Sequence, residues 1–218
     1  MTLIPPVFLF RLAYPCPFQK EIPHQEGDSL LELPPNCRVD DRARLREQPY
    51  FADVRLAWNE QGLGVQWEVR GKDQPLVADV SRPRSSDGFS LWLDTRDTRD
   101  IHRASKYCHH FWFLPTGGGP DLDEPAAGQL KINRALQDAP HTNVGQILLR
   151  KENVRGGYRM EVFLPAATMH GFDPEVNRRL GFFYVVRDSE LGEQTLGLGP
   201  EFPFWEDPSL WSTLELVG

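Results

Sequence analysis

The stretch that decides the fold class is ADVRLAWNEQGLGVQWEVRGKD, residues 52–73. Apolar and polar side chains alternate through both halves of it, so that Val54, Leu56 and Trp58 share one face of the first half. Val65 and Trp67 share a face of the second half in the same way. Alternation with a period of two is typical of a half-buried strand. Asn and Gly between the halves favour a turn, so the stretch predicts a β-hairpin.

The same alternation recurs along the rest of the chain, broken by clusters of Gly, Pro and Asn. Helical patterns are confined to two short turns, at 100–106 and 165–170. Many short strands between turns predict an all-β fold, an antiparallel β-sandwich of the jelly-roll type with two packed sheets and little helix. The further strands are expected at 29–33, 89–94, 107–114, 128–133, 145–150, 158–164, 180–187, 194–198 and 211–217.

The length and composition suit one domain covering residues 1–218. With 218 residues, 40% of them hydrophobic, the chain can bury a full core. Residues 1–51 are expected to supply an N-terminal strand and an irregular extension rich in proline and charge. The three cysteines, Cys16, Cys37 and Cys108, are odd in number and far apart, which predicts reduced thiols. A Cys16–Cys37 bridge stays open as an alternative.

The charge balance excludes several classes of partner. The chain carries 24 Lys and Arg against 31 Asp and Glu, a net charge of −7, which disfavours nucleic acid and anionic membrane surfaces. Its opening residues, MTLIPPVFLFRLAYPC, lack the basic region of a signal peptide. No apolar stretch approaches the roughly 20 residues that span a bilayer. We therefore expect a cytoplasmic protein, a monomer or a weak homodimer.

Five stretches in the same order resemble the family 9 carbohydrate-binding modules, which are DOMON-like sandwiches. Residues 52–73 resemble the hairpin of that family, and the last stretch, WEDPS at 205–209, resembles the ending that precedes its final strand. The three between them are DGFSLWLD at 87–94, GGYRME at 156–161 and LGFFYVVRD at 180–188. The resemblance covers about residues 52–217. It implies a sandwich fold and a carbohydrate-binding function without catalysis.

In that family two tryptophans clamp a sugar ring, because the C–H faces of a pyranose stack on aromatic rings. The resemblance gives Trp205 as one clamp residue, but Arg84 stands where the other is found. Ser90 stands in place of a family carboxylate and Trp112 in place of a family arginine. The resemblance therefore implies an altered site.

Alternation alone brings a second set of side chains together. It places Ser90 and Trp92 on one face of their strand, and His110 and Trp112 on the same face of the next. The rings are expected either to line a ligand surface or to form a second core layer under the segment before Pro49 and the loop 116–125. The candidate ligand-binding residues are Trp205, Trp112, Trp92, Arg84, Ser90 and His110.

Metal and haem sites are weaker hypotheses. Family 9 modules carry structural calcium, and Asp94, Asp97 and Asp100 are candidate ligands, although the arginines between them favour a self-paired turn. His102, Cys108, His109 and His110 offer transition-metal ligands, but adjacent histidines in a strand point to opposite sides. DOMON-like relatives suggest haem bound through Met160, Met169 and His110. We expect no cofactor, with calcium left possible.

The sequence contains no motif of an established catalytic class, neither a Gly-x-Ser-x-Gly elbow nor a His-Glu-x-x-His helix. Its 31 acidic residues leave a glycan-active enzyme as an alternative. We predict a non-catalytic domain that stacks a sugar on tryptophan. The competing hypothesis is a protein-interaction or scaffolding sandwich that binds no sugar.

Overall fold

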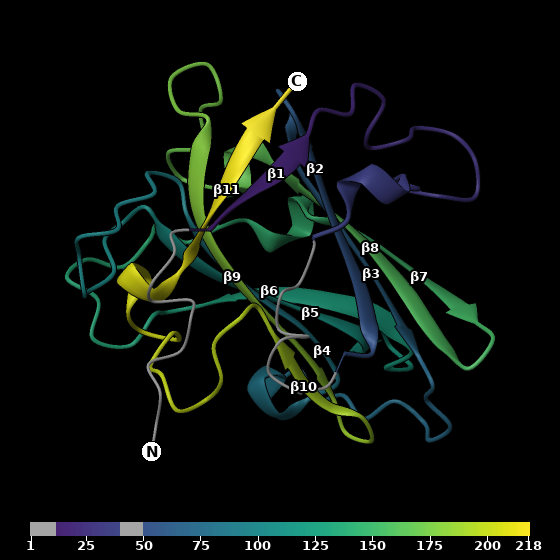
Figure 1. Cartoon of the computed structure of the whole chain (residues 1–218). Helices are drawn as coiled ribbons and strands as arrows, with labels where there is room; N and C mark the ends of the chain where they lie inside the picture. The colour runs from purple at the N-terminus through teal and green to yellow at the C-terminus, as the bar shows by residue number, and fades with distance from the viewer. Residues whose placement is uncertain (1–11, 40–49) are drawn as a thin grey trace.

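The computed structural model describes residues 12–39 and 50–218, and the strands in these ranges form two packed sheets (Figure 1). One sheet has seven strands, in the order β1 (Ala13–Pro17), β11 (Ser212–Val217), β9 (Arg179–Asp188), β4 (Gly88–Asp94), β5 (Cys108–Gly118) and β6 (Glu124–Leu130), and β10 (Gly192–Thr195) also pairs with β9. The other has four, in the order β2 (Ala52–Asn59), β3 (Gly62–Arg70), β8 (Gly157–Pro165) and β7 (Leu148–Val154). The predicted all-β sandwich is confirmed.

Strand pairing is antiparallel except between β1 and β11, which lie side by side and run in the same direction (Figure 1). Helix is limited to short 3₁₀ turns in the described residues, and none has the length and apolar character needed to cross a membrane. These turns are η2 (Pro35–Cys37), η4 (Pro83–Ser85), η5 (Val144–Gln146), η6 (Ala166–Thr168) and η7 (Pro208–Leu210).

The predicted hairpin is formed by β2 and β3. Val54 lies opposite Trp67 in its register. The Asn59 carboxamide oxygen accepts hydrogen bonds from the N–H groups of Gln61 and Gly62 and so closes the turn. An Asn that bonds to the backbone two residues on is a common turn device, which explains why the alternation breaks at this point.

The core lies between the two sheets and is built on aromatic rings. Trp67 of β3 contacts Phe89 of β4, with ring centroids 4.9 Å apart, and Phe89 stacks on Tyr184 of β9 at 5.4 Å. All three side chains are fully buried. Burial of such rings contributes much of the free energy of folding.

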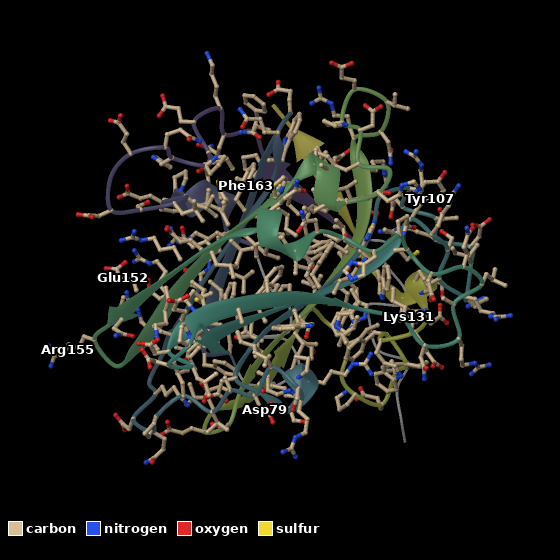
Figure 2. The ribbon with its side chains drawn as sticks, turned by 180° about the vertical axis from the view of Figure 1, so that it is seen from behind. Asp79, Tyr107, Lys131, Glu152, Arg155 and Phe163 are labelled. Atoms are coloured by element: carbon tan, nitrogen blue, oxygen red, sulfur yellow. The ribbon has the colours of Figure 1, made fainter. Side chains whose placement is uncertain are left out.

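The extension covers the outer face of the four-stranded sheet. Leu31 of this segment packs with Ala57 and Phe163, the latter on β8 (Figure 2). The Glu161 carboxylate accepts hydrogen bonds from the N–H groups of Leu30 and Glu32. Since these backbone groups bond to side chains and not to a neighbouring strand, the strand predicted at 29–33 does not form. The part of this segment around Leu31 therefore covers the opposite sheet from Trp92 and does not fold over that ring, while residues 40–49 lie outside the described residues.

Other local predictions differ from the structure at element ends. The predicted turn at 165–170 is confirmed by η6, whereas 100–106 forms no helix. The strand predicted at 145–150 begins only at Leu148, because η5 occupies the residues before it. All three cysteines are buried free thiols, so no Cys16–Cys37 bridge is present. The first eleven residues of the stretch compared with a signal peptide lie outside the described residues.

Candidate functional site

A cleft of about 290 Å³ opens on the outer face of the seven-stranded sheet. Strands β4 and β9 form its floor, the loop around η4 forms one side, and the chain between β10 and η7 forms the other. Its volume is close to the lower end of the range of about 300–1,000 Å³ that is typical of small-molecule sites. The cleft is lined by Pro83, Arg84, Ser86, Gly88, Phe89, Ser90, Trp92, Val185, Arg187, Glu193, Pro200, Phe204 and Trp205.

The pairing of β4 with β5 confirms that the four residues predicted to share one face of these strands do so. Trp92 lies directly opposite His110, and Ser90 opposite Trp112. The Trp92 and His110 rings stack, with centroids 4.1 Å apart and planes at 16°. Two of the six predicted ligand-binding residues are therefore stacked on each other.

The covering of this face comes from a segment that the sequence analysis did not consider. Phe204 meets Trp92 edge to face at 5.6 Å and stacks on Phe183 of β9 at 4.3 Å. Trp92, which contacts both Phe204 and His110, is only 5% exposed, and His110 is completely buried. The second core layer thus exists, but residues around Phe204 close it, and neither the described N-terminal extension nor the loop 116–125 is responsible for it.

Trp112 lies over β6, away from the cleft. A Cβ atom on Gly128 would come within 2.2 Å of the Trp112 ring, so the missing side chain makes room for the indole. Trp112 is half-buried there and does not line the cleft. His110 does not line it either, and its ring is stacked on that of Trp92 from the neighbouring strand.

Trp205 lines the cleft, and the residues after it hold it in place. The Trp211 indole N–H donates to the Phe204 carbonyl oxygen at 2.7 Å. The Asp207 carboxylate accepts a hydrogen bond from the Ser209 N–H at 2.9 Å and so caps η7. The WEDPS stretch therefore has a structural role in addition to supplying Trp205, which remains half-buried beside Phe204.

The polar groups of the cleft come from both of its sides. Arg84 is exposed on η4, and Ser90 is half-buried on the floor. Ser86 fixes the loop, since its hydroxyl accepts from the Asp79 N–H and donates to backbone carbonyl oxygens. Figure 2 shows Asp79 in this loop, at the end of the sandwich where η4 lies. Arg187 and Glu193 form an ion pair of 2.7 Å across β9 and β10.

In the covered layer beside the cleft, both ring nitrogens of His110 and the indole N–H of Trp92 have no hydrogen-bond partner among the described residues. Burial lowers the pKa of His110 to about 3, and the positive charge of Arg84 acts in the same direction. His110 is therefore neutral at physiological pH.

The acidic loop after β4 does not fit a calcium cage. The two carboxylate oxygens of Asp94 accept hydrogen bonds from the N–H groups of Arg96 and Thr98. Asp97 pairs with Arg99 at 3.0 Å and also faces Arg179, while Asp100 is exposed. Calcium needs six to eight oxygen ligands, and the carboxylates of Asp94 and Asp97 already have partners.

The candidate transition-metal and haem ligands lie apart. His109 stacks on Phe111 on the inner face of β5, opposite His110, as predicted. His102 contacts Asp207 at 3.1 Å, and Met160 is buried in the core on β8, far across the sandwich from the outer face that carries His110. Among the residues that the structure describes, no three His, Cys, Asp or Glu side chains form a group that could hold a metal ion.

No protein-family model matches the sequence, and no curated protein matches it. The fold, however, matches solved structures. A family 9 carbohydrate-binding module from Caldicellulosiruptor kristjanssonii in complex with cellotriose superposes with a TM-score of 0.59 at 16% identity, covering 95% of this chain and 94% of that one. The glucose complex of such a module from that organism gives 0.58 at 15% identity, covering 95% and 96%. A protein from Bacteroides uniformis gives 0.54 at 11% identity, covering 83% and 84%.

The chain therefore has the fold of the family 9 carbohydrate-binding modules, as the resemblance predicted. Of the six predicted ligand-binding residues, the cleft brings together Trp205, Trp92, Arg84 and Ser90. Sequence reasoning missed Phe204, Arg187 and Glu193. Alternation along β9 places Arg187 on the same face as Val185 and so gave a signal for it, but no local pattern marks Phe204.

Proposed function

We propose that this protein is a non-catalytic carbohydrate-binding domain and that the cleft beside Trp205 holds a sugar ring. The observation that carries the proposal is the composition of this cleft. Its walls are the aromatic side chains of Trp205, Phe204 and Trp92, and its rim carries the polar groups of Arg84 and Ser90. Sugar recognition needs both, because ring faces stack on aromatic carbon while hydroxyls bond to polar groups.

The likeness to modules solved with cellotriose and with glucose supports the same function. The small number of carboxylates in the cleft also supports a binding function without catalysis. Among the described residues that line it, Glu193 is the single acid, and Arg187 neutralises it. Glycoside hydrolysis ordinarily uses a pair of carboxylates, so the lining favours binding over catalysis.

The alternative of a protein-interaction face is less well supported. A partner that docked on the aromatic face would need exposed rings, but Trp92 is covered by Phe204 and Trp112 is half-buried over β6. The cleft beside Trp205 is open on this face, but its volume of about 290 Å³ suits a small molecule better than a protein partner.

The test is calorimetric titration with a broad panel of monosaccharides and disaccharides. We expect binding by the wild-type protein and a loss of at least about tenfold in affinity for Trp205→Ala, because the stacking surface is removed. Trp112→Ala is the matched control, since it removes an indole from the same sheet face outside the cleft, and it should bind within about twofold of wild type. No heat with any sugar, or full binding by Trp205→Ala, would contradict the proposal.

A further inference from the structure

The charge of the cleft is opposite in sign to that of the chain. The lining contains the guanidinium groups of Arg84 and Arg187 and the carboxylate of Glu193, a net charge of +1, whereas the whole chain carries −7. Arg187 and Glu193 neutralise each other at 2.7 Å. The remaining positive charge is that of Arg84, which pairs with no carboxylate in the described part of the chain.

Nearby acidic side chains do not cancel this charge. Glu206, next to Trp205, pairs with Arg134 at 3.3 Å and does not line the cleft. Glu201 follows Pro200 but does not line the cleft. An exposed guanidinium at the rim of an aromatic cleft offers planar donors that fit a carboxylate.

Arg84 and the aromatic surface belong to the same cleft, since Arg84, Trp92 and Trp205 all line it. The positive charge of Arg84 also acts on His110, which stacks on Trp92, and adds to the lowering of the His110 pKa by burial. The rigid loop fixed by Ser86 keeps Arg84 on that side of the cleft.

We propose that the preferred ligand is a sugar that carries a carboxylate, a uronic acid residue, whose ring contacts Trp205 and Phe204 while its carboxylate binds Arg84. This inference rests on the proposed function and names the ligand class of the same cleft. Ser90 lines the same cleft and is half-buried, so its hydroxyl is available to a sugar hydroxyl.

The experiment uses two matched pairs of probes, the methyl glycosides of glucuronic acid and glucose and those of galacturonic acid and galactose. Members of a pair differ in the carboxylate at C6 alone. At low salt we expect the wild-type protein to bind one of the acidic sugars about five- to tenfold more tightly than its neutral partner, in line with a charge-assisted contact at an exposed site. High salt should shrink this preference, because the Arg84 charge is exposed to screening.

Arg84→Gln should abolish the preference, so that the acidic and the neutral member of each pair bind within about twofold of each other. Arg82→Gln is the matched control, because Arg82 is an exposed arginine two residues away that pairs with Asp79 and does not line the cleft. It should keep the preference. Sodium acetate alone should not bind, since it has no ring to stack.

The outcomes separate the two proposals. Equal binding within both pairs would overturn the uronic acid inference and leave sugar binding intact, whereas no binding by any probe or by the broader panel would overturn both. A preference that survives Arg84→Gln would overturn the assignment to Arg84. Acetate that binds as tightly as the acidic sugars would show a simple anion site and overturn the inference as well.

Discussion

His110 lies flat against Trp92 in the covered layer beside the cleft, and neither of its ring nitrogens has a hydrogen-bond partner among the described residues. Burial lowers its pKa to about 3, from 6.5 in an exposed chain. At a pH between these two pKa values, the His110 imidazole binds a proton in the unfolded chain but not in the folded protein. The stability that His110 contributes is therefore fully present above pH 6.5 and is lost as the pH falls toward 3.

His110→Phe should remove this acid sensitivity, since a phenyl ring can stack on Trp92 without titrating. When the pH is lowered from about 7.5 to about 4.5, the free energy of unfolding should fall by about 2 kcal/mol less in the variant than in wild type. Urea denaturation at the two pH values measures the difference. His141→Phe, at an exposed histidine, is the control and should follow wild type. Equal losses in His110→Phe and wild type would contradict the prediction.

At the scale of elements, a buried lysine joins the end of β3 to β4 and β9. The Lys72 ammonium lies 3.2 Å from a carboxylate oxygen of Asp87 and 3.0 Å from one of Asp188, and all three side chains are almost completely buried. Asp87 precedes β4 and Asp188 ends β9, so this cluster connects the two sheets at one end of the sandwich. The second carboxylate oxygen of Asp188 has no hydrogen-bond partner among the described residues.

Lys72→Met should destabilise the protein by about 3–5 kcal/mol, because it leaves two buried carboxylates without a cation. Lys131→Met is the matched control, since Lys131 forms an exposed ion pair with Asp138 and its loss should cost at most about 1 kcal/mol. The free energy of unfolding in urea measures both. A loss no larger for Lys72→Met than for Lys131→Met would show that the cluster does not hold the sheets together.

Part of this organisation was predictable from the sequence. Alternation predicted the hairpin 52–73 and the common sheet face of Ser90, Trp92 and His110. Such predictions need only the local sequence, because successive side chains in a strand point to opposite faces of the sheet. It did not give the covering by Phe204 or the displacement of Trp112 toward Gly128. Both depend on contacts between segments far apart in the chain, and a glycine that makes room for a ring carries no local pattern.

At the scale of the whole molecule, folding is expected to be independent of calcium. The carboxylates of Asp94 and Asp97 are satisfied by backbone N–H groups and arginines, and the buried pair Asp87 and Asp188 already has its cation in Lys72. The midpoint of thermal unfolding should therefore be the same, within about 1 °C, in excess calcium and in excess EDTA. A clear rise with calcium would contradict this, and magnesium at the same ionic strength controls for screening.

Strand β7 lies at the edge of the four-stranded sheet, and among the described strands β8 alone pairs with it. Arg150, Lys151 and Glu152 follow one another along it, and Glu152 and Arg155 project from the tip of the hairpin (Figure 2). The unpaired N–H and C=O groups of an edge strand can form hydrogen bonds with a strand of another molecule, and charged side chains on the edge oppose this pairing. Concentrated protein in strong salt, where such repulsion fades, should therefore begin to polymerise from this edge.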